Sequence, residues 1–411
     1  MKQSYNQAHP QIMHIDLNSC FATVEQQARP RLRGRPVAVV NRVCTPSATI
    51  ITASYEAKFL GVKVGMRVNE AARLAPGLVA VESDPPKYRY VYHKLLAILQ
   101  DYSAHVRMKS IDEGIIDFSQ TSQDISRRDL VEIGHEIKQR LWDEVGCAMN
   151  CNVGIGTNRF LAKTAAGLHK PNGLDVITHD NLRQTLAGLE LDDLTGIARK
   201  NQARLNSVGI YTPLEFLDAD PLVLKKIVFK SVCGLEWHQR LRGWEVDKRD
   251  FPMRSAGRQY VLESNSMSRE VILQRLHHLC ESVGQKIRSQ GLTARGVQIH
   301  TRSYQSGYWQ ARSMSPLPFF SNQAIYEQAR QLFIEAPEII KEIGVTCYQL
   351  SDDDNPQLSL FGDNTARTRQ VTQLTDDINY RYGARVIHSA DTLGTDDFIK
   401  QKIPFSSTRY L

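Results

Sequence analysis

The sequence predicts a multidomain α+β protein, and three observations lead to this fold class. A chain of 411 residues is long enough for about two to four domains of ordinary size. In residues 12–173, alternating apolar runs are interspersed with stretches of helical spacing, a pattern typical of helices packed on a small sheet. Residues 175–243 are helical in pattern, and residues 259–350 repeat a strand, helix, strand order as a separate module.

The elements of the first half follow from apolar spacing and from helix breakers. Residues 12–21 alternate like a half-buried strand, and a short helix from Val24 onward is broken by Pro30 and Pro36. The remaining elements expected here are strands within 37–53, a helix over 55–60 closed by Gly61, a helix over 88–103, strands at 106–110 and 115–118, a helix over 128–145, a strand over 152–156 and a helix over 159–169 closed by Lys170-Pro171-Asn172-Gly173.

The second half contains one motif with a physical use. Residues 194–210 have the shape of a helix-hairpin-helix, whose tight glycine turn presents backbone N–H groups to a phosphate, although a plain helical hairpin is an equal alternative. Residues 245–258 are polar and charged like a linker. Beyond them we expect a helix over 269–289, strands near 295–303 and 343–350, and a tail that begins at the acidic segment 351–356.

Composition narrows the class of protein. No apolar run approaches the roughly 18 residues of a membrane helix, and the first residues lack the apolar core of a signal peptide, so we expect a cytoplasmic protein with no membrane partner. Seven scattered cysteines include no CxxC pair, which favours buried, reduced thiols. The net charge of +7 is concentrated in residues 225–302, where 15 Lys and Arg face 7 Asp and Glu. Such a basic segment favours a phosphate backbone as the partner.

Three acidic residues point to the chemistry. Asp112 and Glu113 are adjacent at the corner of an apolar hairpin, and Asp16 lies in the strand-like run near the N-terminus. Neighbouring carboxylates raise each other's pKa, so a cluster of them implies either a cation or a shared proton. We favour the cation. Hard oxygen ligands suit Mg²⁺, which takes its other ligands from water and substrate phosphates, so phosphoryl transfer is the expected reaction.

Four long motifs together resemble the Y-family translesion DNA polymerases, which include bacterial DNA polymerase IV and the catalytic subunit of polymerase V. Any one of these blocks alone is weak support, whereas four in family order are specific. The matching blocks are HIDLNSCFATVE (14–25), TASYEAKFLGVKVGM (52–66), SIDEGIIDF (110–118) and NVGIGTNRFLAKTAAGLHKPNG (152–173), followed by the helix-hairpin-helix.

The resemblance implies a template-directed, low-fidelity DNA polymerase without proofreading, which serves DNA damage tolerance. It makes Asp16, Asp112 and Glu113 the metal ligands, helped by the backbone carbonyl of Leu17, and implies two Mg²⁺ ions. Such ions, held ~3.5–4 Å apart, lower the pKa of the primer 3′-hydroxyl and stabilise the leaving pyrophosphate. Asn18 stands where the family carries either Asp or Asn, and we do not count it as a ligand.

The same comparison implies contacts to the incoming deoxynucleoside triphosphate. Phe21 matches the steric gate that excludes a ribose 2′-hydroxyl, although an ordinary core aromatic is the alternative for a lone Phe. Tyr55 and Lys58, one helical turn apart, match the pair that contacts the triphosphate, and Thr52 adds a hydroxyl. Lys163 matches a lysine of the palm that approaches the same triphosphate; without that context it would be read as a solvated surface lysine.

The resemblance also divides the chain and names its partners. Primer-template DNA is the expected macromolecular partner, an accessory protein of the polymerase V type is left open, and we expect a monomer. The implied regions are a catalytic palm (11–22 and 85–173), small fingers (23–84), a thumb (174–245), a linker (246–257), a DNA-binding little finger (258–350) and a C-terminal tail (351–411).

The tail contains a pentapeptide that resembles the sliding-clamp motif of bacterial polymerases. Gln357 would supply an amide anchor, while Leu358, Leu360 and Phe361 would fill an apolar groove of the clamp. An ordinary linker is the alternative for so short a motif.

Two other functions are alternatives to a DNA polymerase. A non-catalytic, polymerase-like scaffold that binds the clamp would explain the domains, but such relatives lose the acids that this chain retains. A nucleotidyl cyclase uses a similar pair of metals but leaves the thumb, the basic segment and the clamp peptide unexplained.

Overall fold

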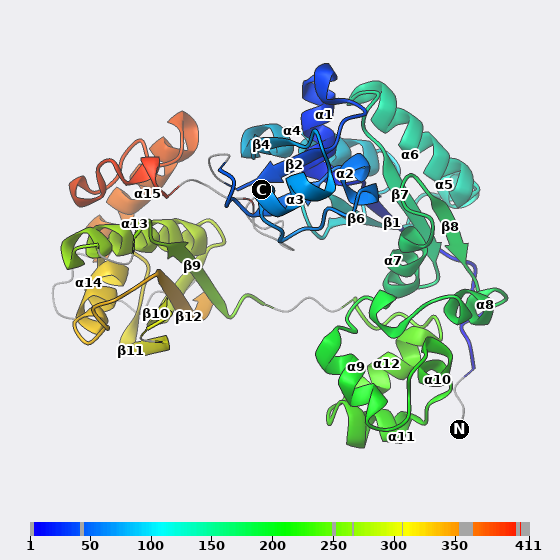
Figure 1. Cartoon of the computed structure of the whole chain (residues 1–411). Coiled ribbons are helices and arrows are strands. Elements are labelled where there is room, and N and C mark those ends of the chain that lie inside the picture. The colour runs from blue at the N-terminus through cyan, green and yellow to red at the C-terminus, as the bar shows by residue number, and fades with distance from the viewer. Residues whose placement is uncertain are drawn as a thin grey trace. The chain divides into compact units, whose positions relative to one another are not determined.

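The computed structural model describes residues 4–41, 45–248, 252–264, 267–305, 307–352, 365–399 and 403. The chain divides into two compact units, one formed mainly by residues up to 249 and one by residues 250–401 (Figure 1). Within the described residues, no helix is long and apolar enough to cross a membrane.

The first unit is built around a five-stranded sheet with the order β5-β6-β1-β7-β8 (Figure 1). Its central strand, β1, pairs antiparallel with β6 on one side and with β7 on the other. Because β8 pairs with β7, the sheet extends past the boundary predicted at residue 173. The strands are β1 (Ile12–Leu17), β5 (Val106–Met108), β6 (Glu113–Asp117), β7 (Cys151–Gly156) and β8 (Leu174–Ile177).

The two faces of this sheet have different partners because side chains alternate along a strand. Met13 and Ile15 of β1 are buried in the main core, which helices α4 (Pro85–Gln100) and α6 (Leu130–Glu144) complete. Ile12, of opposite parity, packs instead with α7. The even-numbered positions of β1, which include Asp16, therefore lie on the face that α7 covers.

Helix α7 (Arg159–Leu168) approaches that face closely because β7 carries glycines. Gly154 is paired with His14 of β1, and a Cβ on it would lie 2.1 Å from the carbonyl oxygen of Ala162 in α7. Only glycine leaves room for a helix backbone at that distance. The Asn-Val-Gly-Ile-Gly sequence thus determines how near α7, with Lys163, comes to the sheet.

A small three-stranded sheet with the order β3-β2-β4 lies within the region for which fingers were predicted. The strands expected within 37–53 are confirmed, and the helix expected over 55–60 ends where predicted, since Gly61 has φ +91°. The elements here are α1 (Cys20–Ala28), the 3₁₀ turn η1 (Pro30–Leu32), β2 (Val37–Val40), β3 (Ile50–Ala53), α2 (Tyr55–Phe59), α3 (Val68–Leu74) and β4 (Val79–Glu82).

Short helices packed around Phe216 and Trp237 occupy the region for which a thumb was predicted. In the predicted helix-hairpin-helix, Gly196 has φ +99° before α9 and Gly209 has φ +81° after it, but a 3₁₀ turn stands in place of the first helix. The described elements are α8 (Leu182–Ala187), η2 (Leu191–Asp193), α9 (Arg199–Asn206), α10 (Pro213–Asp218), α11 (Pro221–Val223), the π-helical η3 (Leu224–Val228) and α12 (Cys233–Leu241), with α5 (Gln123–Ser126) preceding α6 in the first unit.

The second unit is a four-stranded antiparallel sheet, with the order β11-β10-β12-β9, packed against two helices. The predicted helix and two strands are confirmed, whereas β11 and α14 were not predicted, and β9 begins inside the predicted linker. The elements are β9 (Ser255–Val261), α13 (Arg269–Arg288), β10 (Leu292–Ser303), β11 (Gly307–Phe319), α14 (Asn322–Phe333) and β12 (Glu342–Asp352).

The prediction of a C-terminal tail over 351–411 is wrong for residues 365–399, which fold onto the second unit. The turns η4 (Ala390–Thr392) and η5 (Thr395–Asp397) pack on α13, and helix α15 (Thr365–Tyr382) is joined to α13 by an ion pair. Arg288 of α13 pairs with Asp376 at 2.6 Å, and Glu281 of α13 pairs with Arg385. These ion pairs join residues far apart in the sequence, so no local pattern predicted them.

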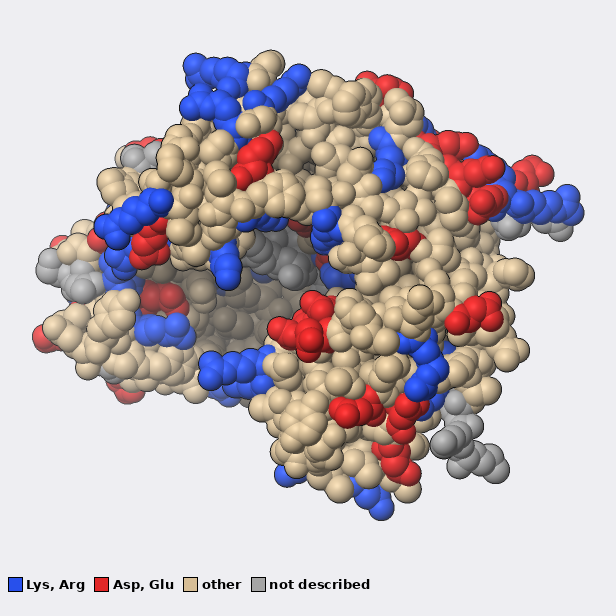
Figure 2. Space-filling model, turned by 45° about the vertical axis from the view of Figure 1, so that its right-hand side comes forward, with Lys and Arg blue, Asp and Glu red and all other residues tan. Residues whose placement is uncertain are grey.

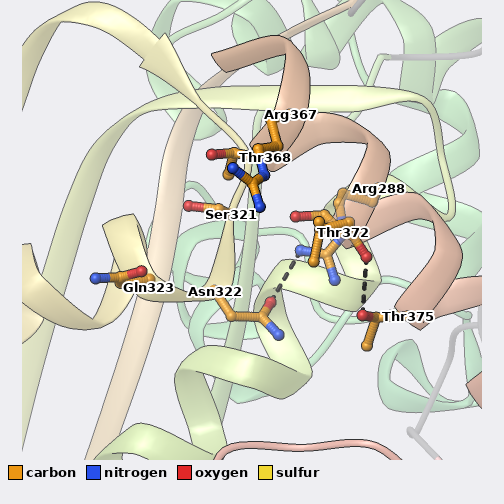
Figure 3. Close-up of a pocket in the computed structure, with 9 residues that line it drawn as sticks. Arg288, Ser321, Asn322, Gln323, Arg367, Thr368, Thr372 and Thr375 are labelled. Atoms are coloured by element: carbon orange, nitrogen blue, oxygen red, sulfur yellow. Dashed lines mark hydrogen bonds between the residues drawn. The ribbon is translucent and has the colours of Figure 1, made fainter. Parts of the chain in front are cut away.

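A polar cavity of about 430 Å³ lies between α15 and the start of α14 (Figure 3). Arg288 donates to the side chain of Asn322 at 2.9 Å across it, and Arg367 and Thr368 line it from α15. The side of α15 that faces this cavity is thus mainly polar, whereas Ile399 at the end of the segment packs in the apolar core of the unit.

Docking of this segment is expected to weaken in acid because of His278. Its ring is buried and hydrogen-bonded to Thr395 Oγ1 at 2.6 Å, and burial lowers its pKa from 6.5 to about 3. The nearby positive charges of Arg385, Arg258 and Arg275 contribute to this lowered value. The unfolded chain takes up a proton near pH 6.5 but the folded unit only near pH 3, so stability falls as pH drops through that window, by about 2 kcal/mol between pH 7.5 and 5.

Hydrogen exchange of residues 385–399 at pH 7.5 and pH 5.0 measures this effect. The His278→Gln variant, which keeps a hydrogen-bonding group near Thr395, should lose most of the pH dependence. An equal pH dependence in the variant and the parent would contradict the assignment to His278.

Candidate active site

The three predicted ligands lie on neighbouring strands of the first sheet. Asp16 on β1 is directly opposite Glu113 on β6, so both side chains lie on the α7 face. Asp112 immediately precedes β6, and its carbonyl accepts a hydrogen bond from the N–H of Leu17 at 2.8 Å. The backbone thus brings together the four positions that the sequence assigned to the metal.

The carboxylate side chains, however, are each engaged with protein partners. Asp16 pairs with Lys170, Glu113 accepts from Lys163 Nζ at 2.5 Å, and Asp112 accepts from the hydroxyl of Ser110. Among the described residues, no three His, Cys, Asp or Glu side chains stand together as a ready-made metal site. In place of the predicted convergence of oxygens, lysines neutralise two of the acids.

The electrostatics of these acids still fit a cation. Burial raises the pKa of Asp112, and the negative charges of Asp16 and Glu113 raise it further, against the hydrogen bond from Ser110. For Glu113 burial acts in the same direction, but His14 and Lys163 outweigh it and lower the pKa to about 2. A buried carboxylate beside two like charges is stabilised by a divalent ion, and three carboxylates are the donor set that Mg²⁺ prefers.

His14 was not predicted as a site residue. It lies two residues before Asp16 on β1, is buried, and places Nε2 3.4 Å from Glu113 Oε2. The alternation of β1 puts His14 on the same face as Asp16, and this could be predicted from the sequence. Its contact with Glu113 depends on the register between β1 and β6.

Asn18 serves as a bridge between elements. Its side-chain oxygen accepts from the hydroxyl of Tyr55 at 3.4 Å and from the amide of Asn152, while its nitrogen donates to Asn150 at 2.5 Å. These contacts use both ends of the amide, and they support leaving Asn18 out of the ligand set.

A cluster of donors lies beside Asp16. Lys58 on α2 donates to Ser19 Oγ at 2.8 Å, and its Nζ lies 4.7 Å from the ring centre of Tyr55. Burial lowers the pKa of Lys58, and the positive charge of Lys170 lowers it further. Burial has the opposite effect on Tyr55 and raises its pKa, so the hydroxyl stays protonated and able to donate. Two ammonium groups and a phenol close together form a site suited to a polyanion.

Lys170 is the member of this cluster that the sequence analysis missed. By its composition the segment Lys170-Pro171-Asn172-Gly173 predicts only the end of a helix, although it lies inside one of the four matching blocks. The structure brings its ammonium group to Asp16, whereas Lys163 pairs with Glu113.

Two further predicted nucleotide contacts, Lys163 and Thr52, have partners within the protein. Lys163 pairs with Glu113, and Thr52 donates to the carbonyl of Ile51 at 2.9 Å. Phe21, on α1, stacks on the ring of Tyr88. The clamp peptide, Gln357, Leu358, Leu360 and Phe361, lies outside the described residues.

Several cations of the basic segment 225–302 are paired within the part of the chain that the structure describes. Arg240 pairs with Asp247 at 2.6 Å, Arg288 with Asp376, and Arg269 donates to the carbonyl of Ala336 at 3.2 Å. On the face in Figure 2, Lys and Arg are interspersed with acidic and uncharged residues. The surplus charge predicted from composition is thus partly used inside the fold.

Comparison with known proteins places these features in a family. The impB/mucB/samB family matches residues 15–167, and its C-terminal domain matches residues 254–360. DNA polymerase IV of Moorella thermoacetica is 34% identical over 392 residues, covering 93% of this chain and 96% of that protein. DNA polymerase IV 1 of Bacillus subtilis is 30% identical over 398 residues, covering 94% of each chain.

Solved structures share the fold. A Y-family DNA polymerase chimera, Dbh-Dpo4(243-245)-Dbh, superposes with a TM-score of 0.69 at 23% identity, covering 83% of this chain and 99% of that one. An insertion ternary complex of Dbh DNA polymerase has a TM-score of 0.58 at 23% identity with the same coverage.

Proposed function

Since this chain belongs to the impB/mucB/samB family of Y-family translesion DNA polymerases, we propose that Asp16, Asp112 and Glu113, with the carbonyl of Leu17, hold two Mg²⁺ ions during nucleotide addition. When bound, the ions activate the primer 3′-hydroxyl and stabilise the charge that develops on the phosphates. The observation that carries the proposal is the meeting of these acids, on adjacent strands, with the donors Tyr55, Lys58 and Lys170.

The donors are proposed to hold the triphosphate of the incoming deoxynucleotide. Lys58 and Lys170 supply positive charge and Tyr55 a neutral donor, all within reach of Asp16. Without nucleotide, Lys170 neutralises Asp16. A triphosphate offers Lys170 more negative charge, so Lys170 changes partner and leaves the Asp16 carboxylate free to act as a ligand.

Lys170→Ala is therefore expected to raise KM for the deoxynucleotide about tenfold or more, because a charge-assisted contact contributes roughly 1.5–3 kcal/mol. Single-nucleotide primer extension over a range of nucleotide concentrations measures this. Lys170→Arg keeps the charge and should retain most of the affinity. A parental KM in the alanine variant would exclude the contact.

The predicted regions are proposed to act as palm, fingers, thumb and little finger, with the boundaries corrected as above. Primer-template DNA would then contact the thumb turn at Gly196 and the second unit through its backbone. Such contacts are independent of base sequence and weaken steeply with salt.

The peptide Gln357–Phe361 is proposed to bind the sliding clamp. It lies between β12 and α15, both of which belong to the second unit. Deleting residues 357–361 should leave synthesis without clamp unchanged and abolish its stimulation by clamp, measured as product length on a primed circle. Equal stimulation of the deletion variant and the parent would refute this role.

A further inference from the structure

The ring of Phe21, the predicted steric gate, is stacked on the ring of Tyr88. The ring centres are 4.3 Å apart and the planes differ by 9°. Phe21 lies on α1, and Tyr88, from α4, is completely buried. Parallel rings at this distance fix each other's plane and position. Any movement of the Phe21 ring on that side is therefore blocked by Tyr88.

Tyr88 is itself held by a buried carboxylate. Its hydroxyl donates to Glu25 Oε1 at 2.9 Å, and the Glu25 side chain has no exposed surface. Burial raises the pKa of Tyr88, and the charge of Glu25 raises it further, so the phenol keeps its proton and remains the donor. The hydrogen bond restrains the Tyr88 ring at its far end from the backbone.

The charge on Glu25 is compensated within the same group. Lys87 Nζ donates to both carboxylate oxygens, at 2.9 and 3.1 Å, and Arg29 lies 3.7 Å away. A buried carboxylate persists when it is paired and hydrogen-bonded in this way. The Glu25 carboxylate is therefore occupied by protein donors, and its role is to fix the position of the Tyr88 hydroxyl.

Phe21, Glu25, Lys87 and Tyr88 are spaced so that they join α1 to α4 in two places. Glu25 follows Phe21 by one helical turn on α1, and Lys87 and Tyr88 are neighbours near the start of α4. Helices α1 and α4 are thus joined at two successive levels, once by stacked rings and once by ionic hydrogen bonds. Movement of one contact strains the other.

We propose that Tyr88, Glu25 and Lys87 are positioning residues for sugar selection, because they hold the Phe21 ring where a ribose 2′-hydroxyl would collide with it. This inference rests on the proposed role of Phe21 as steric gate. Discrimination between deoxyribose and ribose then depends on how far the Phe21 ring can be displaced from the sugar. That ring can be displaced only if the Tyr88 ring moves.

The test compares kcat/KM for a deoxynucleotide with that for the matching ribonucleotide in primer extension by the full chain. The ratio is taken within one protein sample, so a variant that is only partly folded lowers both values together. Tyr88→Met fills most of the space but has no ring to stack, and should lower the ratio about tenfold. Tyr88→Phe keeps the stack and should lower it by less.

Tyr92→Met is the matched control. Tyr92 lies one turn further along α4, is buried in the same core, and has its aromatic contact with His93 instead of Phe21. It should lose stability while keeping the parental ratio. Glu25→Gln removes the anchoring charge with little change in shape and should lower the ratio, and it provides an independent test if Tyr88→Met does not fold.

The outcomes separate the two proposals. If Phe21→Ala lowers the ratio but Tyr88→Met leaves it at the parental value, Phe21 is the gate and Tyr88 does not position it. If Tyr88→Met does not fold, Glu25→Gln takes its place in this comparison. If Tyr92→Met lowers the ratio as much as Tyr88→Met, general loosening of the core explains the effect and the inference is overturned. If Phe21→Ala itself leaves the ratio unchanged, both the gate and its support are rejected.

Discussion

Asp112→Asn is expected to lower kcat for primer extension by at least about 1,000-fold, because an amide cannot supply the negative charge that the proposed cations require. Stability should change in the opposite direction. Burial and the charges of Asp16 and Glu113 raise the pKa of Asp112, which means that its ionised form is disfavoured in the fold. A neutral amide removes this cost, so the thermal midpoint without metal should rise or stay level.

Primer extension in Mg²⁺ and thermal unfolding with and without Mg²⁺ measure the two effects. The parent should gain stability from Mg²⁺ and the variant should not. Asp101→Asn, at an exposed acid after α4, is a matched control that should keep parental activity. Extension by Asp112→Asn at the parental rate would remove the catalytic assignment, and with it the proposed mechanism.

Phe21→Ala is expected to lower the preference for deoxynucleotides over ribonucleotides by about 100-fold, because removing the ring opens space for a 2′-hydroxyl. The same change removes the stack on Tyr88 and leaves a cavity, so the free energy of unfolding should fall by about 3 kcal/mol. Kinetics with both nucleotides, together with urea unfolding, separate selectivity from stability.

Phe21→Leu is the comparison variant, since it keeps apolar volume but no aromatic plane. It should fall between the parent and Phe21→Ala in sugar preference. A preference that stays at the parental value in both variants would show that Phe21 is an ordinary core aromatic.

The positions of the acids were predictable because they depend on local pattern. The alternation of residues 12–21 predicts a strand, although β1 ends at Leu17, and the turn before Glu113 predicts a hairpin corner. What the acids contact was not predictable. Lys163 and Lys170 reach Glu113 and Asp16 only because α7 approaches the sheet over Gly154, an effect of packing between elements distant in the chain.

The elements missed in the second unit have a similar explanation. Strand β11 contains Pro316 and Pro318, which argue against a central strand, but β11 is at the edge of its sheet, where proline is tolerated. Helix α15 has few inward apolar residues, and its attachment relies on ion pairs such as Arg288–Asp376. Long-range ion pairs leave no periodic signal in a sequence.

For this protein, the order and spacing of motifs were sufficient to identify a Y-family polymerase and its acidic residues, because these features depend on short segments and their order. Folding decided which side chain each acid contacts, that Lys170 lies beside Asp16, and that residues 365–399 pack on the second unit. It also placed Tyr88 and Glu25 behind Phe21. These results depend on contacts between helices and strands whose distances only the packed chain sets.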